Sequence, residues 1–208
     1  FPVGRVELKE LRLENLPLMK EWQNKHGVKC LYFVCADDDA NSHQLALEAG
    51  FDWVATHVTF VCHLKQRAPI APQAAATIRP FMDSDLDALQ ILARDSFVDT
   101  RFFCDTHFSP QRCQEFYAQW IYASAYEDFS DCLWVAELNR QPIGFIACSV
   151  GSKTQVGRID LIGVDQTTRG LGVGQSLVYT AQGWFQQKNI NRVEVVSQAR
   201  NAVACAFY

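Results

Sequence analysis

Leu161-Ile-Gly-Val-Asp-Gln-Thr-Thr-Arg-Gly-Leu-Gly-Val-Gly-Gln-Ser-Leu177 is the stretch that decides the fold of this chain. It continues an apolar, β-branched run over 159–164, which predicts a buried strand. Polar turn residues follow, then glycines at 170, 172 and 174, and then a predicted helix that begins at Ser176. The first turn of a helix leaves backbone N–H groups unpaired, and the helix dipole adds positive charge there. The pattern therefore predicts an anion site.

Two common phosphate-binding motifs do not fit this glycine-rich turn. The dinucleotide motif G-x-G-x-x-G would need a glycine where the chain has Gln175, and the P-loop would need a Gly-Lys-Ser/Thr sequence after the glycines. Arg169-Gly-Leu-Gly-Val-Gly174 instead resembles the R/Q-x-x-G-x-G/A pyrophosphate loop of the GNAT family of N-acetyltransferases. A tight strand-to-helix turn that binds no ligand is the alternative.

The resemblance implies acetyl-CoA as a cosubstrate and no metal. In the family, the strand before the loop pairs with the pantetheine arm, the loop holds the pyrophosphate, and an asparagine after the next strand also contacts the arm. The matching residues here are Ile162, Gly163, Val164, Arg169, Gly170, Leu171, Gly172, Val173, Gly174, Ser176 and Asn201. Asn201 is equally suited to cap the helix that follows it, so its role stays open.

The resemblance also implies a catalytic tyrosine. A tyrosine in the last helix of the family's site donates a proton to the departing thiolate, and Tyr208 matches its place. A thiol has a pKa of about 8.5 and a tyrosine about 10, so Tyr208 would be protonated at neutral pH. Packing is the alternative role for Tyr208. The general base stays undecided between Asp160 and a chain of water. Cys205 has no histidine near it in the sequence, which argues against a covalent intermediate.

A predicted loop over 96–105 carries one arginine among aromatic residues, a composition that suits an anionic, stackable ligand. Thr100-Arg-Phe102 and Phe116-Tyr-Ala-Gln-Trp-Ile121 resemble the sugar-nucleotide members of the GNAT family. The resemblance implies an acceptor such as a thymidine-diphosphate-linked 4-amino-4,6-dideoxyhexose, and a role in cell-surface polysaccharide biosynthesis. The residues that would contact this acceptor are Arg101, Phe102, Tyr117 and Trp120.

Three alternatives stay open for this region. Arg101 could cap a surface while the aromatic residues pack in the core. The acceptor could be another small amine or a protein amine, although such acceptors favour an acidic groove. The chain could also be a non-catalytic module that binds acyl-CoA or a sugar nucleotide.

The order of predicted elements over 77–208 matches the GNAT order. A short strand at 77–80 and a helix from Ser84 are followed by three strands over 131–164, the helix 176–187 and a strand at 192–196. The resemblance implies an α+β fold with a mixed, mostly antiparallel sheet flanked by helices. Because the chain stops inside its last helix, we expect that the C-terminal end of this domain is missing from the sequence.

Residues 1–67 are predicted to form a second, smaller α/β unit. Its strand, polar turn, helix and Gly50 resemble the closing segment of a GNAT domain, but it contains no glycine-rich loop. We interpret it as a degenerate half-domain that lost the cofactor site, and an unrelated small lobe is the alternative. Pro69 and Pro72 predict a linker over 68–76.

Composition excludes several classes of partner. The net charge of −4 argues against a nucleic-acid or anionic-membrane surface, and no apolar run approaches the ~18 residues of a membrane span. The eight cysteines are scattered without a C-x-x-C pair, which predicts reduced thiols, no zinc site and a cytoplasmic protein. The sequence leaves the oligomeric state open, with a homodimer among the assemblies compatible with it.

Overall fold

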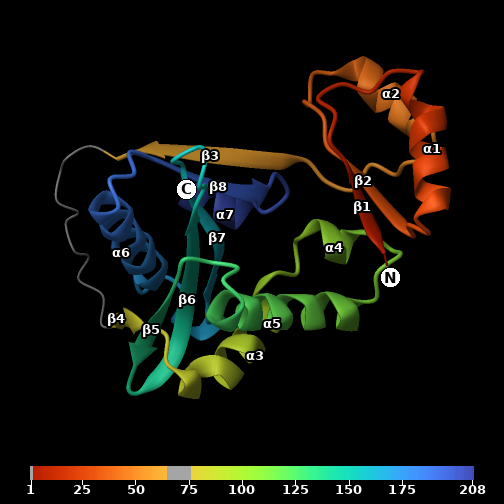
Figure 1. The fold of residues 1–208 in the computed structure, drawn as a ribbon. Helices are drawn as coiled ribbons and strands as arrows, with labels where there is room; N and C mark the ends of the chain where they lie inside the picture. The colour runs from red at the N-terminus through yellow and green to blue at the C-terminus, as the bar shows by residue number, and fades with distance from the viewer. Residues whose placement is uncertain (1, 65–75) are drawn as a thin grey trace. The chain divides into compact units, whose positions relative to one another are not determined.

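The computed structural model describes residues 2–64 and 76–208, which fall into two compact units, 1–56 and 57–208 (Figure 1). The predicted linker over 68–76 lies outside the described residues except for Ala76. None of the helices in these two ranges combines the length and the apolar character that a bilayer crossing requires.

The first unit is a small α/β arrangement. Strands β1 (Val3–Val6) and β2 (Cys30–Phe33) pair in parallel, helix α1 (Asn15–Lys25) lies between them in the chain, and helix α2 (Ala40–Glu48) follows. A parallel pair needs such a crossover because the chain must return to the same end of the sheet.

The polar turn that the sequence predicts in this unit caps helix α2. Asp39 accepts a hydrogen bond from the backbone N–H of Ser42 at 3.0 Å, and the Ser42 hydroxyl oxygen accepts one from the Leu11 N–H at 2.7 Å. Gly50 follows the helix with a φ of +87°, the left-handed conformation that glycine adopts most readily. The predicted stop at Gly50 is therefore confirmed.

The second unit is built on one sheet. Within the described residues it has six strands in the order β3-β8-β7-β6-β5-β4, and only the β7–β8 pair is parallel. The strands are β3 (His57–His63), β4 (Thr77–Pro80), β5 (Cys132–Leu138), β6 (Gln141–Val150), β7 (Gly157–Val164) and β8 (Arg192–Gln198). The predicted mixed, mostly antiparallel sheet is confirmed, and strands β4 to β8 begin and end within two residues of the prediction.

Helices cover both faces of this sheet (Figure 1). Helix α6 (Val173–Gln187) packs on one face through Leu177, Ala181 and Phe185. Helices α3 (Leu86–Ser96) and α5 (Pro110–Tyr126) pack on the other. Strand β6 divides its side chains between the two cores because successive residues of a strand point to opposite faces: Ile146 and Cys148 face α6, whereas Phe145 and Ala147 face α3 and α5.

Strand β3 corrects the predicted boundary between the units. The sequence predicts a first unit over 1–67, which would include β3, whereas the structure pairs β3 along the whole of β8, from His57 opposite Gln198 to His63 opposite Arg192. The first unit therefore ends at Thr56. Alternation of apolar and polar residues predicts a strand but does not name its partner, which is why the boundary was misplaced. The interpretation of the first unit as a degenerate half-domain stays a prediction.

Candidate active site

Strands β7 and β8 pair at one end and separate toward the other. Their parallel ladder covers only Gly157–Ile159 against Val193–Val195. Beyond it, the described strands pair Leu161–Val164 with β6 alone and Val196–Gln198 with β3 alone. The β8-facing edge of β7 thus presents backbone N–H and C=O groups, which need partners when they are buried. The predicted contacts Ile162, Gly163 and Val164 all lie in this stretch, and their backbone groups point alternately to β6 and to the β8-facing edge.

Gly163 has a packing role of its own. A Cβ at this position would lie 2.8 Å from the Phe145 ring and 2.9 Å from a Leu92 methyl group, closer than real side chains approach. Glycine is therefore required here by the α3 side of the core. This requirement holds whether or not a ligand pairs with the strand.

The glycine-rich turn connects β7 to α6 as predicted, but the helix begins at Val173 instead of Ser176. Gly172 is its N-cap in the left-handed conformation, with a φ of +76°, and Gly170 has a φ of +81°. A Cβ at either position would meet no atom of the described residues within 4 Å, so the turn is open on its outer side. The unpaired N–H groups of the first helical turn make this open side suitable for a phosphate.

The other predicted contacts in the turn differ in their exposure and in the groups that they can offer a ligand. Leu171 is exposed, and Arg169 folds back so that its Nε donates to the Val164 carbonyl oxygen at 3.3 Å. The Val173 side chain lies in the core, so only its backbone can face a ligand. Gly174 allows close approach of the last helix, since a Cβ there would touch the Phe207 ring at 3.4 Å.

Ser176 is the one predicted contact whose donors are already used. Its N–H and its hydroxyl both donate to the Gly172 carbonyl oxygen, each at 3.0 Å. A phosphate needs donors, so the structure favours Ser176 as a support for the first turn of α6 over the predicted cofactor contact.

Asn201 and Tyr208 bracket helix α7 (Ala202–Phe207). The Asn201 side-chain oxygen accepts a hydrogen bond from the Ala204 N–H at 2.9 Å, which is an N-cap. The structure thus shows the capping role, and a contact between Asn201 and a cofactor stays a prediction.

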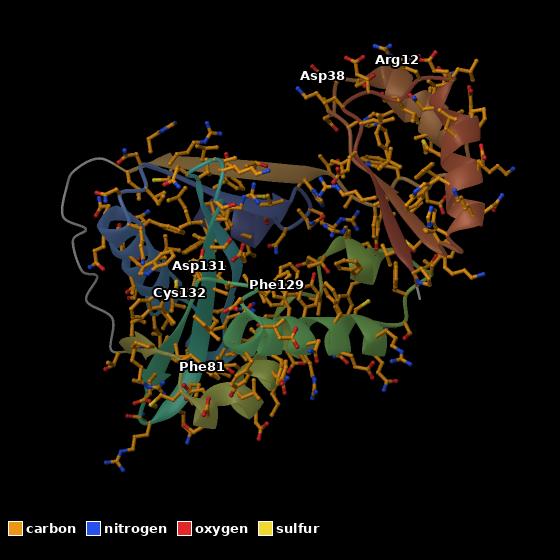
Figure 2. The ribbon with its side chains drawn as sticks, viewed as in Figure 1. Arg12, Asp38, Phe81, Phe129, Asp131 and Cys132 are labelled. Atoms are coloured by element: carbon orange, nitrogen blue, oxygen red, sulfur yellow. The ribbon has the colours of Figure 1, made fainter. Side chains whose placement is uncertain are left out.

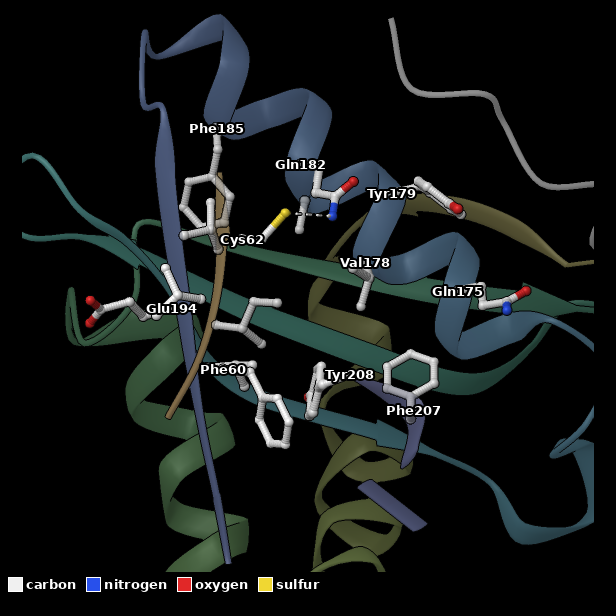
Figure 3. Close-up of a pocket in the computed structure, with 15 residues that line it drawn as sticks. Phe60, Cys62, Gln175, Val178, Tyr179, Gln182, Phe185, Glu194, Phe207 and Tyr208 are labelled. Carbon is white, nitrogen blue, oxygen red and sulfur yellow. Dashed lines mark hydrogen bonds between the residues drawn. The ribbon is translucent and has the colours of Figure 1, made fainter. Parts of the chain in front are cut away.

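Tyr208 lies beside the point where β7 and β8 separate. It lines a pocket of about 280 Å³ together with Ile159, the last residue of β7 that pairs with β8, and with Val178 of α6 (Figure 3). Beside Tyr208, the ring of Phe60 on β3 also lines the pocket, and the two ring centroids are 5.5 Å apart. The pocket is therefore on the α6 side of the sheet.

The surroundings of Tyr208 keep it protonated. Burial raises the pKa of its hydroxyl above the usual value, and the neighbouring Cys148 thiol raises it further. A phenol with a raised pKa holds its proton at neutral pH. The structure thus keeps the phenol in its proton-carrying form, and the role of Tyr208 as the proton donor stays a prediction.

Asp160 is half-buried on the opposite side of the sheet. Its carboxylate accepts hydrogen bonds from the Ser149 hydroxyl at 2.8 Å and the Ser130 hydroxyl at 3.1 Å. Burial raises the pKa of Asp160 to about 6, and the two hydroxyl groups oppose this rise. The carboxylate thus changes its charge near neutral pH, whereas an ordinary aspartate does so near 3.9.

The predicted acceptor loop is partly helical. Residues Arg101–Cys104 form the one-turn helix α4 where the sequence predicts a loop. The Arg101 guanidinium lies over the Phe102 ring at 4.5 Å from its centroid, and Nη1 lies 3.4 Å from Nε2 of His57. Arg101 therefore stacks on Phe102 and lies beside His57, and a contact with an acceptor stays a prediction.

Tyr117 and Trp120 are stacked on α5, with centroids 6.0 Å apart and planes 6° apart. Tyr117 is only 4% exposed and belongs to the core between the sheet and α5, so the structure supports the packing alternative for this residue. Trp120 is half-buried, and its Nε1 is a buried donor with no acceptor among the described residues. Of the two, Trp120 is the one with an unused polar atom to offer a ligand.

His57 also belongs to this region, although no motif in the sequence predicts it there. It lies 44 residues before Arg101 in the chain, on a strand that the sequence assigned to another unit. Only the pairing of β3 with β8 brings it close to Arg101. A position that depends on strand pairing of this kind leaves no local pattern in the sequence.

Comparisons with known proteins agree with this architecture. The acetyltransferase (GNAT) family matches residues 92–208, more than half of the chain. An uncharacterized N-acetyltransferase of Methanocaldococcus jannaschii is 28% identical over 137 residues, which cover 64% of this chain. The chain spans 58% of the length of that relative.

Solved structures share the fold. A GCN5-related N-acetyltransferase from Sphaerobacter thermophilus has a TM-score of 0.60 at 19% identity, over 90% of this chain and 60% of that one. The PaiA N-acetyltransferase from Thermoplasma acidophilum, in complex with coenzyme A, has a TM-score of 0.51 at 18% identity, over 64% of this chain and 86% of that one. At such identities the likeness concerns the fold alone.

Proposed function

The chain belongs to the acetyltransferase (GNAT) family, and from this premise we propose that it is an N-acetyltransferase. It moves the acetyl group of acetyl-CoA directly to the amine of a nucleotide-linked amino sugar. The observation that carries the acetyl transfer is the separation of β7 from β8, with the glycine-rich turn after β7 and Tyr208 beside the point of separation.

The residues present fit acetyl-CoA. The open outer side of the turn at Gly170 and Gly172 leaves room for a pyrophosphate close to the backbone. The β8-facing edge of β7 after Ile159 offers backbone groups to the amides of a pantetheine arm. These two features follow one another along the chain, so one extended ligand can use both.

The chain contributes binding, orientation and a proton. When bound, acetyl-CoA supplies a thioester carbonyl and a thiolate leaving group. Backbone N–H groups over 162–164 can donate hydrogen bonds to the carbonyl oxygen as negative charge develops on it. Tyr208 holds a proton on its phenol oxygen and can donate it to the leaving sulfur.

The acceptor proposal rests on the Arg101 region. Its guanidinium is held in place by the Phe102 ring and by His57, and a pre-positioned guanidinium suits a phosphate group. The unused Nε1 of Trp120 adds a donor, and the aromatic rings nearby can cover a base or the deoxy edge of a sugar. These residues resemble those of dTDP-fucosamine acetyltransferase, which supports a dTDP-4-amino-4,6-dideoxyhexose.

Two other functions make different demands. A non-catalytic binding module needs the glycine-rich turn but no donor at Tyr208, and an enzyme for a protein amine or polyamine favours an acidic groove over Arg101. Neither relative nor solved structure above is named for a sugar nucleotide. A screen of amines with acetyl-CoA, read by free thiol release, distinguishes these functions: only a nucleotide amino sugar should give rapid release.

Arg101→Ala should raise the KM for the sugar nucleotide by about 10- to 100-fold, because a charge-assisted hydrogen bond to phosphate contributes about 1.5–3 kcal/mol. The KM for acetyl-CoA should change little. Steady-state kinetics with each substrate varied in turn measure both values. Inhibition by dTDP alone should weaken to a similar extent.

Arg112→Ala is the matched control, since it removes the same charge from an exposed side chain that pairs with Glu115 at the start of α5. It should leave both KM values within about two-fold, as is usual for an exposed ion pair. If dTDP does not inhibit the parent, or if Arg101→Ala weakens acetyl-CoA instead, the acceptor proposal is wrong while the acetyl transfer stands.

A further inference from the structure

Asp160 occupies an irregular position in β7. The register of β6 against β7 shifts, so that Ala147 lies opposite Leu161 and Cys148 lies opposite Ile159. Within the described strands, Asp160 is therefore the extra residue of a β-bulge, without a partner on β6. It also follows Ile159, the last residue that pairs with β8. Bulges of this kind redirect a side chain and are common beside active sites.

The bulge turns the Asp160 carboxylate toward α5. Its Oδ2 accepts from the Ser130 hydroxyl, whose oxygen lies 3.1 Å from the Ser124 hydroxyl on α5. Its Oδ1 accepts from Ser149 at 2.8 Å. Ser130 lies between the end of α5 and the start of β5, flanked by Phe129 and Asp131, which Figure 2 labels. The Phe129 ring, next to Ser130 in the chain, is 5.5 Å from that of Trp120, so the segment that holds the carboxylate also contacts a predicted acceptor residue.

Tyr208 approaches the same part of β7 from the other face. Ile159 lines the pocket of Tyr208, and Asp160 is the next residue. The Cys148 thiol lies opposite Ile159 on β6. It adds to the rise that burial causes in the pKa of Tyr208, and Asp160 adds to the rise that Cys132 and burial cause in the pKa of Cys148. The sheet thus carries a proton donor on the α6 side and a carboxylate on the α5 side at one point of β7.

We propose that Asp160 is the general base of the acetyl transfer and that Ser149 and Ser130 position its carboxylate. This inference rests on the proposed function. The amine nitrogen forms a bond to the thioester carbon as the carbon–sulfur bond breaks, Asp160 accepts the proton that the nitrogen loses, and the sulfur receives one from Tyr208. The net change moves one proton from nitrogen to sulfur, and solvent returns both side chains to their starting states.

The charged groups around Asp160 define a test that does not need turnover. Arg158 on β7 favours the carboxylate, Asp131 just before β5 opposes it, and the Cys148 thiol on β6 is a further titratable neighbour. Carbon-13 NMR of the side-chain carboxyl, assigned with Asp160→Asn, should show a titration with a pKa of about 6. Ser149→Ala should move it to higher pH, because the hydroxyl stabilises the charged form.

The rate should follow the same titration. A general base acts only when deprotonated, so kcat/KM should fall as the pH falls through the pKa of Asp160. Asp160→Asn keeps the shape but replaces one acceptor oxygen with an N–H donor. Because it removes the base, it should lower kcat/KM by about 10²–10⁴ and remove this acidic limb. Ser149→Ala should keep most of the rate at high pH. It should move the acidic limb of the kcat/KM profile to higher pH, by the same amount as the NMR titration. Asp87→Asn, which alters an exposed carboxylate on α3, should change neither.

The outcomes separate this inference from the proposed function. Calorimetry with CoA should show that Asp160→Asn still binds. If the parent is active but Asp160→Asn keeps its rate and its acidic limb, or if Ser149→Ala moves the NMR titration without moving the limb, Asp160 is structural and the inference is wrong. If the parent releases no thiol with any amine, the proposed function fails and the inference fails with it.

Discussion

Tyr208→Phe should lower kcat by about 10²–10³ and leave CoA binding within a few-fold, since the change removes one proton donor and keeps the ring. The ring packs against Phe60 and Phe207, so the pocket should keep its shape. The phenol carries its proton at neutral pH and can donate it toward the thiolate as that forms, and a general acid typically contributes an effect of this size. Single-turnover kinetics by free thiol release, with calorimetry for CoA, measure the two quantities separately.

Tyr126→Phe is the control for this variant. Tyr126 is an exposed residue at the end of α5 whose hydroxyl donates to Asp83 at 2.9 Å, so its loss should not alter the rate. A Tyr208→Phe rate within a few-fold of the parent would mean that water protonates the thiolate and that Tyr208 is packing. A parallel loss of CoA binding would mean that the pocket had changed shape.

Gly172→Val should weaken CoA binding on the order of 100-fold, which corresponds to about 2.8 kcal/mol. The valine side chain would enter the open outer side of the turn, where a Cβ meets no described atom and where a phosphate would lie. It would therefore separate the phosphate from backbone donors that contribute about 1.5–3 kcal/mol each as charged hydrogen bonds. Calorimetric titration with CoA measures the loss.

Gly50→Val separates this effect from backbone strain. Gly50 has a φ of +87° against +76° for Gly172, and a Cβ at either position meets nothing within 4 Å among the described residues. Both variants should lose about 1–3 kcal/mol of stability from the left-handed conformation, but Gly50→Val should bind CoA as the parent does. Unchanged CoA affinity in Gly172→Val would show that the pyrophosphate does not bind at this turn.

The sequence predicted the part of the site that local patterns encode. The glycine spacing and the apolar run predicted the strand, the turn and the helix, and strands β5 to β8 are confirmed. The start of α6 was misplaced at Ser176, because a left-handed Gly172 caps the helix without any polar side chain to mark it. The fold class followed from the order of these elements.

The remainder depends on pairings that the sequence does not show. Ser149 and Ser130 lie 11 and 30 residues from Asp160, and only the bulge in β7 directs the carboxylate to them. His57 reaches Arg101 only because β3 pairs with β8. Tyr117 and Trp120 belong to the same aromatic motif, but the structure places them differently. Tyr117 is a core residue, whereas Nε1 of Trp120 has no acceptor among the described residues. Register and burial are properties of the assembled sheet.

The mass of the acceptor after incubation with acetyl-CoA tests the central claim most directly. The purified chain is mixed with acetyl-CoA and dTDP-4-amino-4,6-dideoxygalactose, and product and free thiol are measured together. We expect one acetyl group on the sugar nitrogen for each CoA released, with a much slower reaction for Tyr208→Phe. Binding of CoA without thiol release, for this amine and for every other amine tested, would contradict the account and leave a binding module.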